Sequence, residues 1–187
     1  MKITIIGAGN IGSAVAACLA KGHLYNEKDI IISTPHTDKL ENLHKQFPAI
    51  RIMTENQYAI SEADIIILAV KPCIVDEVLS PLRRTQILVS LVTGISISHL
   101  AHLSETEMPI FRVVPNIAIT EHSSLTLITS RKAGKEHQQL IKQTFEEGGK
   151  CLFAEEKQLD IISALTSSGI AFALKYIHAA MQAGIEL

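Results

Sequence analysis

The sequence predicts an α/β fold in which a doubly wound, mostly parallel sheet of Rossmann-like type is followed by the start of an all-helical domain. Apolar runs of strand length alternate with helical patterns from the first residues to about residue 157, which is typical of a parallel sheet. The first apolar run opens directly into a glycine-rich turn. The last thirty or so residues are instead apolar nearly all round at helical spacing.

The glycine-rich turn is Gly7-Ala8-Gly9-Asn10-Ile11-Gly12, and a helix of small residues follows it. In this pattern the first glycine allows a tight bend, the second lets the backbone approach a pyrophosphate, and the third lets helix and strand pack closely. The free N–H groups and positive dipole end of the helix favour a phosphate. The order strand, turn, helix predicts a dinucleotide-binding unit; the alternative is a tight turn with no ligand.

Composition and charge narrow the class of protein. The 187 residues are 47% hydrophobic and 19% charged, enough for one domain or one domain with an appendage. A net charge of −2 without a long basic run argues against nucleic acid and anionic membranes, so we expect a small-molecule partner. No signal peptide or convincing membrane span is visible, and Cys18, Cys73 and Cys151 lack metal-ligand spacing, which predicts a cytoplasmic protein with reduced thiols. No metal is expected, because His99 and His102 lack neighbouring ligands and suit a solvated helix surface.

The second predicted strand ends in two hydroxyl residues. Where an NAD site usually carries a carboxylate for the ribose 2′-OH, this chain has Ser33 and Thr34. Hydroxyls and backbone N–H groups donate to a 2′-phosphate, so NADP (as NADPH) is preferred and NAD remains possible; the alternative is an ordinary helix cap. Around this point the pattern predicts strands at 29–33, 51–53 and 64–70 and helices at 39–47 and 58–63.

Two later strands also end in residues that suit ligand contact. The buried fourth strand ends in Lys71-Pro72, at the sheet edge where doubly wound proteins bind ligands; the alternative is a surface lysine. A strand at 110–114 closes on Pro115-Asn116, whose amide can contact a nicotinamide or a substrate, unless it is a turn asparagine. Between them we expect a helix at 75–82, a strand at 86–92, the turn Thr93-Gly94 and a helix at 96–103.

The remaining sequence divides into an end of the sheet and a helical segment. A strand at 124–129, a helix at 135–147, a stop at Gly148-Gly149 and a strand at 151–154 complete the sheet. The predicted domains are therefore 1–157, which binds NAD(P), and 158–187, an incomplete helical dimerisation segment. Because residues 159–187 are apolar all round, we expect a partner subunit or further chain to cover them, in a homodimer or higher homo-oligomer.

Five segments together resemble the pyrroline-5-carboxylate reductase family across essentially the whole chain. They are the glycine turn, Ser33-Thr34-Pro35, Leu68-Ala69-Val70-Lys71-Pro72, Val89 to Ile97 (VSLVTGISI) and Leu165 to Phe172 (LTSSGIAF). The resemblance implies a Rossmann-like domain with an all-helical dimerisation domain and NAD(P)H as hydride donor. It further implies the reduction of 1-pyrroline-5-carboxylate to L-proline, the last step of proline biosynthesis.

The resemblance also assigns roles to individual residues. The glycine turn would hold the pyrophosphate, Ser33 and Thr34 the 2′-phosphate, and Asn56 the adenosine ribose. The nicotinamide half would lie along Ala69-Val70-Lys71-Pro72 and Thr93-Gly94, with Asn116 nearby. Near the substrate, Glu156 and Ser167-Ser168-Gly169 correspond to the family's pocket, where the imine carboxylate would lie on helix N-terminal N–H groups. The sequence nominates no catalytic side chain.

Departures from the family pattern keep two further functions open. The chain has Asn116-Ile117-Ala118 where the family has Asn-Thr-Pro, and SSGIAF at 167–172 where the family has GSGPAY. Phe172 thus lacks a hydroxyl, and the family's final helices are not found before Leu187. The alternatives are a catalytically impaired NADP-binding sensor or regulatory relative, and a reductase of another imine or of a hydroxy acid.

Overall fold

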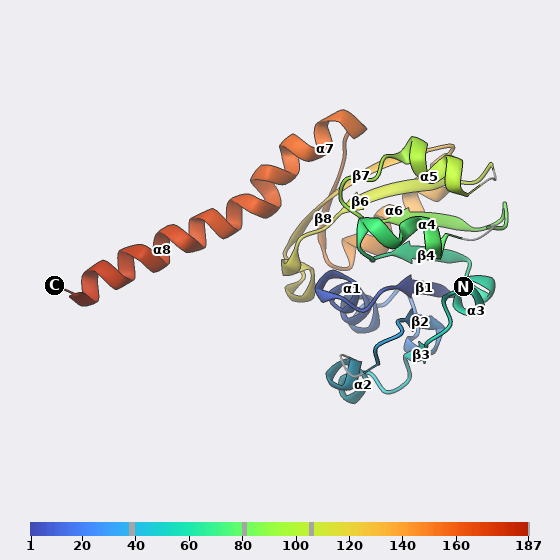
Figure 1. The fold of residues 1–187 in the computed structure, drawn as a ribbon, viewed down its shortest axis with the longest axis horizontal. Coiled ribbons are helices and arrows are strands. Elements are labelled where there is room, and N and C mark those ends of the chain that lie inside the picture. The colour runs from blue at the N-terminus through green and yellow to red at the C-terminus, as the bar shows by residue number, and fades with distance from the viewer. Residues whose placement is uncertain (38–39, 80–81, 105–106, 187) are drawn as a thin grey trace.

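The chain folds around one eight-stranded sheet, seen in a computed structural model that describes residues 1–37, 40–79, 82–104 and 107–186 (Figure 1). The strand order is β3-β2-β1-β4-β5-β6-β7-β8. The strands are β1 (Ile3–Ile6), β2 (Ile30–Ser33), β3 (Arg51–Met53), β4 (Ile65–Leu68), β5 (Ile87–Ser90), β6 (Ile110–Val114), β7 (Ser124–Arg131) and β8 (Gly149–Phe153).

The sheet is doubly wound and mostly parallel, which confirms the predicted fold class. Every neighbouring pair is parallel except β6 with β7, which are antiparallel. From β1 the chain builds outward through β2 and β3 and then returns to place β4 on the other side of β1. The carboxyl ends of β1 and β4 therefore form the switch point at which open α/β sheets bind ligands.

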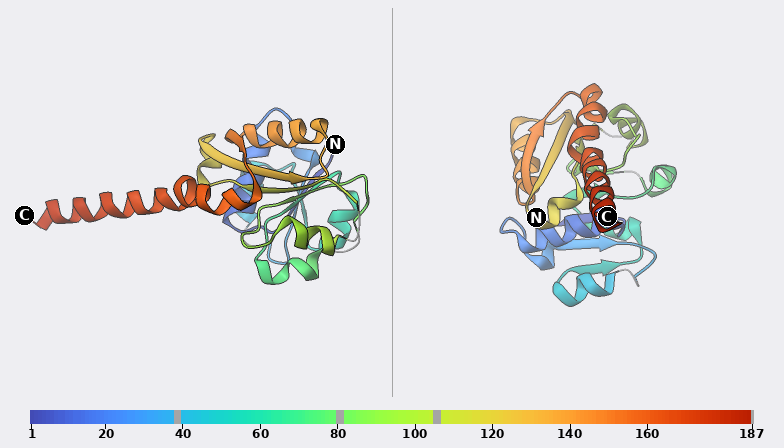
Figure 2. Two further views of the ribbon diagram at one scale, coloured as in Figure 1. Left: turned by 90° about the horizontal axis from the view of Figure 1, so that it is seen from above. Right: turned by 90° about the vertical axis from the view of Figure 1, so that its left-hand side faces the viewer.

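Helices cover both faces of the sheet, as Figure 2 shows. Side chains from α1, α2 and α6 pack on one face, around Ile3, Ile5 and Phe145. Those from α3, α4 and α5 pack on the other, around Ile6 and Ile66. The helices of the sheet domain are α1 (Asn10–Lys21), α2 (Glu41–Gln46), α3 (Asn56–Glu62), α4 (Val75–Val78), α5 (Ile97–Leu103) and α6 (Lys135–Glu146), with 3-10 turns η1 (Glu27–Asp29), η3 (Pro72–Ile74) and η4 (Ile117–Glu121).

Most predicted elements are present, with differences at their ends. The helix predicted at 75–82 is the single turn α4, because Leu79 is already extended; residues 80–81 lie outside the described part. A proline at position 81 of the sequence disfavours a longer helix. Of the predicted helix at 39–47, α2 spans Glu41–Gln46, and Lys39 lies outside the described residues. Gly149, predicted as part of a stop, begins β8 with a positive φ of 139°.

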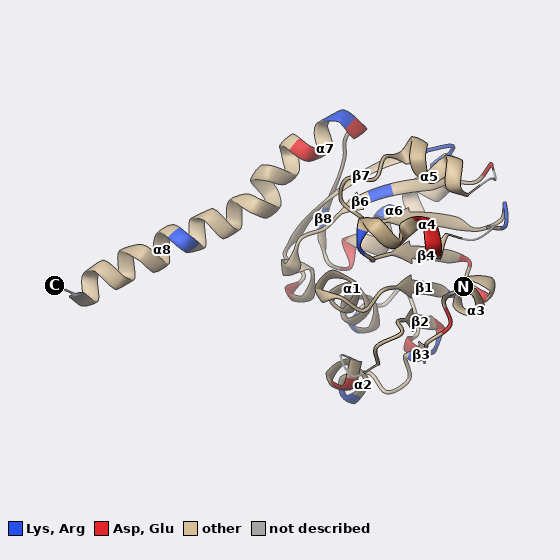
Figure 3. Cartoon of the chain, in the orientation of Figure 1, with Lys and Arg blue, Asp and Glu red and all other residues tan. Residues whose placement is uncertain are grey.

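The chain ends in a continuous helical arm that projects away from the sheet domain (Figures 1 and 2). It consists of α7 (Glu156–Ser163), the π-helical turn η5 (Ala164–Ser168) and α8 (Gly169–Glu186). Leu159 is completely buried against the sheet domain, whereas Phe172, Tyr176 and Ile185 are 74–81% exposed. Lys175 is the single Lys or Arg in the sequence of α8, and most of that helix is uncharged (Figure 3).

The arm is also long and apolar enough to cross a membrane by length and composition alone. The stretch Glu156–Ile185 has a mean hydropathy of 1.2 in its most apolar window. A helix covered by another protein surface meets the same criterion. Hydropathy by itself therefore does not assign the arm to a membrane.

A charged cluster closes the edge of the sheet at β3. Glu62 of α3 accepts hydrogen bonds from Arg51 of β3, at 2.8 and 3.0 Å, and from the Lys2 ammonium at 2.7 Å. These hydrogen bonds, those from Arg51 first, lower the pKa of the Glu62 carboxyl from its ordinary 4.5 to about 2. A lowered pKa in the folded state means that the carboxylate stabilises the fold above about pH 4.5 and loses that effect as the pH falls toward 2.

We therefore expect Glu62→Gln to lower the melting temperature most at neutral pH. The difference from the unsubstituted chain should shrink as the pH falls from 5 to 3, as measured by circular dichroism at each pH. Glu41→Gln is the matched control, because its ion pair with Lys45 is exposed and 3.9 Å long. A difference for Glu62→Gln that stays constant over this range would contradict the assignment.

Candidate functional site

The glycine turn fits tightly against the end of β4. Gly7 has a φ of +106°, and a Cβ on it would lie 2.5 Å from the Ala69 carbonyl oxygen. A Cβ on Gly12 would lie 2.0 Å from the Gly7 carbonyl oxygen. The Gly7 N–H donates to the Ser33 carbonyl at 2.8 Å, so the ends of β1, β2 and β4 meet at this turn. Gly7 is required by its positive φ and by its close approach to Ala69, and Gly12 by its close approach to Gly7.

Gly9 lies in a different environment, at the open side of the same turn. A Cβ on Gly9 would have nothing within 4 Å, and the residue is exposed just before α1. The first N–H groups of α1 have no partner within the helix and carry the positive end of its dipole. The turn therefore offers unobstructed backbone donors to a diphosphate, as the sequence predicts.

A groove of about 560 Å³ runs over the turn and brings together residues from the ends of three strands and from the start of α3. It joins the glycine turn to the segments that follow β2 and β4 and to the start of α3. Predicted cofactor residues that line it are Gly7, Ala8, Gly9, Ser33, Thr34, Asn56, Ala69, Val70 and Lys71. A second cavity of about 620 Å³, against α1 and α2, shares Ala8 and Gly9 and also includes Asn10.

The end of β2 forms the floor of this groove. Ser33 is completely buried, and its hydroxyl donates to the Asn56 Oδ1 at 2.7 Å. Thr34 is also buried, and its Oγ1 accepts the His36 N–H at 3.3 Å. The two predicted hydroxyls thus hold Asn56 and the segment that follows β2 in place.

The other end of the site lies along the segments that follow β4, β5 and β6. Lys71-Pro72 is exposed directly after β4, and Thr93-Gly94 is exposed after β5. Asn116 is buried and both ends of its amide have partners: Oδ1 accepts the Ala118 N–H at 3.0 Å, and Nδ2 donates to the Thr166 carbonyl at 2.9 Å. The amide predicted to contact a nicotinamide or a substrate therefore ties the loop after β6 to the arm.

A partly buried ion pair anchors the arm beside that loop. The Arg112 guanidinium of β6 lies 2.9 Å from the Glu156 Oε1, and the same oxygen accepts the Ile97 N–H of α5 at 2.8 Å. Arg112 is 7% exposed, so its charge is compensated inside the protein by this carboxylate. Glu156, predicted near the substrate, thus fixes the starts of α5 and α7 at the carboxyl edge of β6.

The predicted helix start at Ser167-Ser168-Gly169 is wrong. The three residues lie inside a continuous helix, at the junction of η5 and α8, and the Gly169 N–H bonds to the Ala164 carbonyl. A proline at position 170 would lack an N–H and end the preceding helix, but this chain has Ile170 there. Free N-terminal N–H groups for a carboxylate are therefore not formed at this point, and the π-helical turn widens the helix instead.

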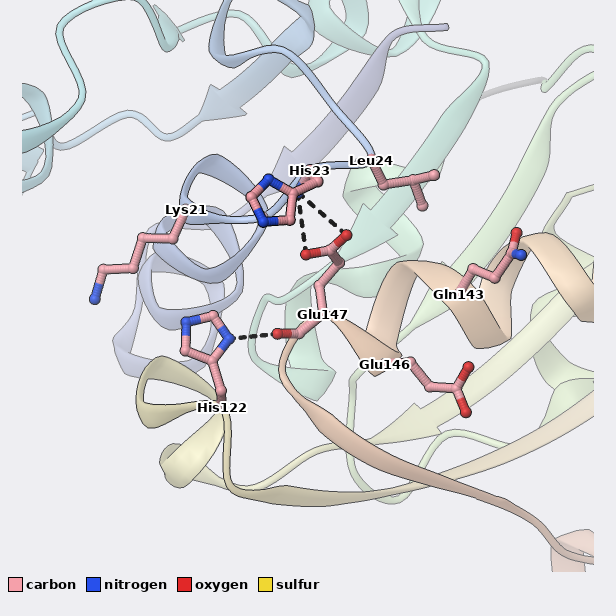
Figure 4. A pocket seen from close by; sticks show the side chains of 8 residues that line it. Lys21, His23, Leu24, His122, Gln143, Glu146 and Glu147 are labelled. Atoms are coloured by element: carbon pink, nitrogen blue, oxygen red, sulfur yellow. Dashed lines mark hydrogen bonds between the residues drawn. The ribbon is translucent and has the colours of Figure 1, made fainter.

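A third cavity, of about 590 Å³, lies at the C-terminal end of α1 (Figure 4). The Glu147 carboxylate accepts the His23 N–H at 3.1 and 3.2 Å, and the Glu147 carbonyl pairs with the His122 Nδ1. Gly22 leaves room for this carboxylate, because a Cβ there would lie 2.2 Å from it. These contacts join the ends of α1 and α6, and they lie about 18 Å along α1 from the glycine turn.

The three cysteines and His99 lie outside the groove over the glycine turn. All three cysteines are free, and burial raises the pKa of the Cys18 thiol to about 11 and that of the Cys151 thiol to about 12. His99 pairs with Asp76 on the surface at 3.2 Å. Within the described ranges, no three His, Cys, Asp or Glu side chains gather in a way that could hold a metal ion.

Two residues at the site were not predicted from the sequence. Arg112 lies in the middle of the apolar run IFRVV. Because a charged side chain in a strand buried on both faces requires a partner, this arginine could have been identified from the sequence as a paired residue. His36 lines the groove after β2, but nothing in its neighbouring residues distinguishes it from a loop histidine.

Comparison with known proteins gives the family. A model described as "NADP oxidoreductase coenzyme F420-dependent" matches residues 2–94. Pyrroline-5-carboxylate reductase 2 of Dictyostelium discoideum is 31% identical over the whole chain, which covers 68% of that protein. The chain belongs to the pyrroline-5-carboxylate reductase family. It spans only 36% of the length of pyrroline-5-carboxylate reductase 1 of the same organism, at 28% identity.

Solved structures of this family match the entire chain, arm included. The 1-pyrroline-5-carboxylate reductase of Streptococcus pyogenes is 29% identical with a TM-score of 0.87, and the match covers 100% of this chain and 70% of that one. The Plasmodium falciparum pyrroline carboxylate reductase with NADP bound is 25% identical with a TM-score of 0.88 and the same coverage. The predicted family, the Rossmann-like fold and the NADP-type cofactor are thereby confirmed.

Two substitutions in the glycine turn should separate its role in folding from its role in cofactor binding. Gly12→Ala should lower the free energy of unfolding by about 2 kcal/mol, because its Cβ meets the Gly7 carbonyl. Gly9→Ala should lower the free energy of unfolding by less than about 1 kcal/mol, because alanine is a poorer N-cap than glycine. It should weaken NADPH binding about tenfold, because its Cβ would enter the open side of the turn. Urea unfolding and NADPH fluorescence titration measure the two effects; equal stability losses, or unchanged NADPH affinity of Gly9→Ala, would contradict this account.

Proposed function

We propose that this chain reduces 1-pyrroline-5-carboxylate to L-proline with NADPH. One structural observation supports this above the others. The dinucleotide groove over the glycine turn and the anchor of the arm at Arg112 and Glu156 lie along the same carboxyl edge of the sheet. A cofactor in the groove would thus extend toward the residues that the family resemblance assigns to the substrate.

The groove fits a dinucleotide phosphate. The space beside Gly9 leaves its backbone open to the pyrophosphate, and Asn56, which is held by Ser33, would bind the adenosine ribose. Ala69-Val70-Lys71-Pro72 and Thr93-Gly94 follow neighbouring strands and would hold the nicotinamide half. NADPH, when bound, supplies the hydride for the reduction.

The protein would contribute position and charge to this reaction. A protonated cyclic imine is already an electrophile, so binding and orientation carry most of the catalysis and no general acid is assigned. Glu156, whose Oε1 is held by Arg112 and the Ile97 N–H, retains a second carboxylate oxygen for a cationic nitrogen. The hydroxyls of Ser167 and Ser168, on the widened turn of the arm, would bind the substrate carboxylate.

A second candidate is an NADP-binding relative without reductase activity. The observation that favours it is the unbroken helix through Ser167-Ser168-Gly169, which offers no free N–H groups to a carboxylate. Phe172 also lacks the hydroxyl that the family carries at this position. Such a protein would retain the groove over the glycine turn and bind the cofactor without turnover.

An assay of NADPH oxidation separates these functions. With 1-pyrroline-5-carboxylate as substrate, we expect absorbance at 340 nm to fall and L-proline to form in equal amount. Glu156→Gln should lower kcat/KM about tenfold or more, since it removes a charge opposite the cationic nitrogen. NADPH binding without proline formation would contradict the reductase and favour the second candidate; turnover of another imine or a hydroxy acid alone would reassign the substrate.

We further propose that a second copy of the chain covers the arm and that the protein works in the cytoplasm, in line with its free thiols. The exposed apolar side chains of the arm are too many for a stable monomer surface. They are Ile161, Leu165, Ile170, Phe172, Leu174, Tyr176, Ile177, Met181 and Ile185.

Light scattering after size-exclusion chromatography tests this assembly. At micromolar concentration we expect a homodimer or a larger homo-oligomer. Leu174→Glu should shift it toward the monomer without unfolding the sheet domain, because Leu174 is 61% exposed in one copy. A monomer at all concentrations, or association only with added lipid vesicles, would contradict the proposal.

A further inference from the structure

At the adenosine end of the groove, the nearest residues to an expected 2′-phosphate are the hydroxyls of Ser33 and Thr34, and neither carries a positive charge. Rossmann proteins distinguish NADP from NAD at the carboxyl end of β2, usually with an arginine for the phosphate. Here Ser33 is completely buried and its proton is donated to Asn56. Thr34 is 6% exposed, and its hydroxyl both accepts the His36 N–H at 3.3 Å and donates to the His36 carbonyl at 3.5 Å. Neither hydroxyl supplies a charge or a free proton.

Three ionisable side chains line the groove in the described part of the chain, and one of them, His36, lies beside the end of β2, where a 2′-phosphate would bind. Lys71 follows β4, on the far side of the glycine turn from the end of β2. Glu77 of α4 carries a negative charge and would repel a phosphate. His36 is exposed three residues after Ser33, and its backbone is fixed on Thr34 by the two hydrogen bonds.

We propose that the imidazole of His36 binds the 2′-phosphate of NADPH and thereby sets the preference of this chain for NADPH over NADH. This inference rests on the proposed function, because it assumes a dinucleotide in the groove. An imidazolium gives the phosphate a charge-assisted hydrogen bond, which is about twice as strong as a neutral one. Ser33 then acts by orienting Asn56 toward the ribose, and Thr34 by holding the His36 backbone.

Isothermal titration with two adenosine fragments tests the assignment without turnover. The probes are 2′,5′-ADP, which carries the phosphate, and 5′-AMP, which lacks it. His36→Ala should weaken 2′,5′-ADP binding about tenfold and leave 5′-AMP binding within about twofold. His36→Lys should restore tight 2′,5′-ADP binding, since it returns a cation. His44→Ala, which removes an exposed histidine of α2 outside the groove, is the matched control.

The outcomes separate this inference from the proposed function. An unchanged ratio of 2′,5′-ADP to 5′-AMP affinity in His36→Ala would overturn the role of His36 and leave the reductase proposal intact. An unsubstituted chain that binds neither fragment would overturn the groove itself. Thermal unfolding of each variant excludes misfolding as the cause. The preference for 2′,5′-ADP should also weaken as salt rises, since salt screens a phosphate bound in a solvent-exposed groove.

Discussion

The close fit of Gly7 and Gly12 against the end of β4 is the constraint on which the site depends. These two residues let the turn after β1 lie within van der Waals distance of the Ala69 carbonyl. The segments that follow β1, β2 and β4 then share one groove at the switch point of the sheet. Because a side chain at either glycine would separate the turn from β4, the groove and the packing of α1 depend on the same contacts.

A second set of contacts attaches the helical arm to the same edge of the sheet. The Arg112–Glu156 ion pair and the hydrogen bond from Asn116 to the Thr166 carbonyl come from β6 and the loop after it. They orient the arm relative to the nucleotide groove, although the arm beyond them is exposed in a single chain. Glu156, which the resemblance assigns to the substrate, and Asn116, which it assigns near the nicotinamide, are therefore also structural anchors of the arm.

The sequence predicted the sheet and the glycine turn well, because both depend on local patterns. Apolar strand runs and the spacing of Gly7, Gly9 and Gly12 report directly on backbone geometry. The continuous helix through Ser167-Ser168-Gly169 was not predicted, because the interpretation followed the family's pattern although Ile170 replaces the proline that would break the helix. The partners of Ser33, Asn116 and Arg112 lie 23 to 50 residues away in the chain, so no local pattern reveals them.

Amide hydrogen exchange with and without NADPH tests the central claim most directly. If the open backbone of the glycine turn binds the diphosphate, exchange should slow at residues 8–12 and, through the shared groove, at 33–36 and 69–71. The helical end at 175–186 should exchange equally with and without the cofactor. Cofactor binding that leaves exchange in the glycine turn unchanged, or protects only residues elsewhere in the chain, would contradict the account.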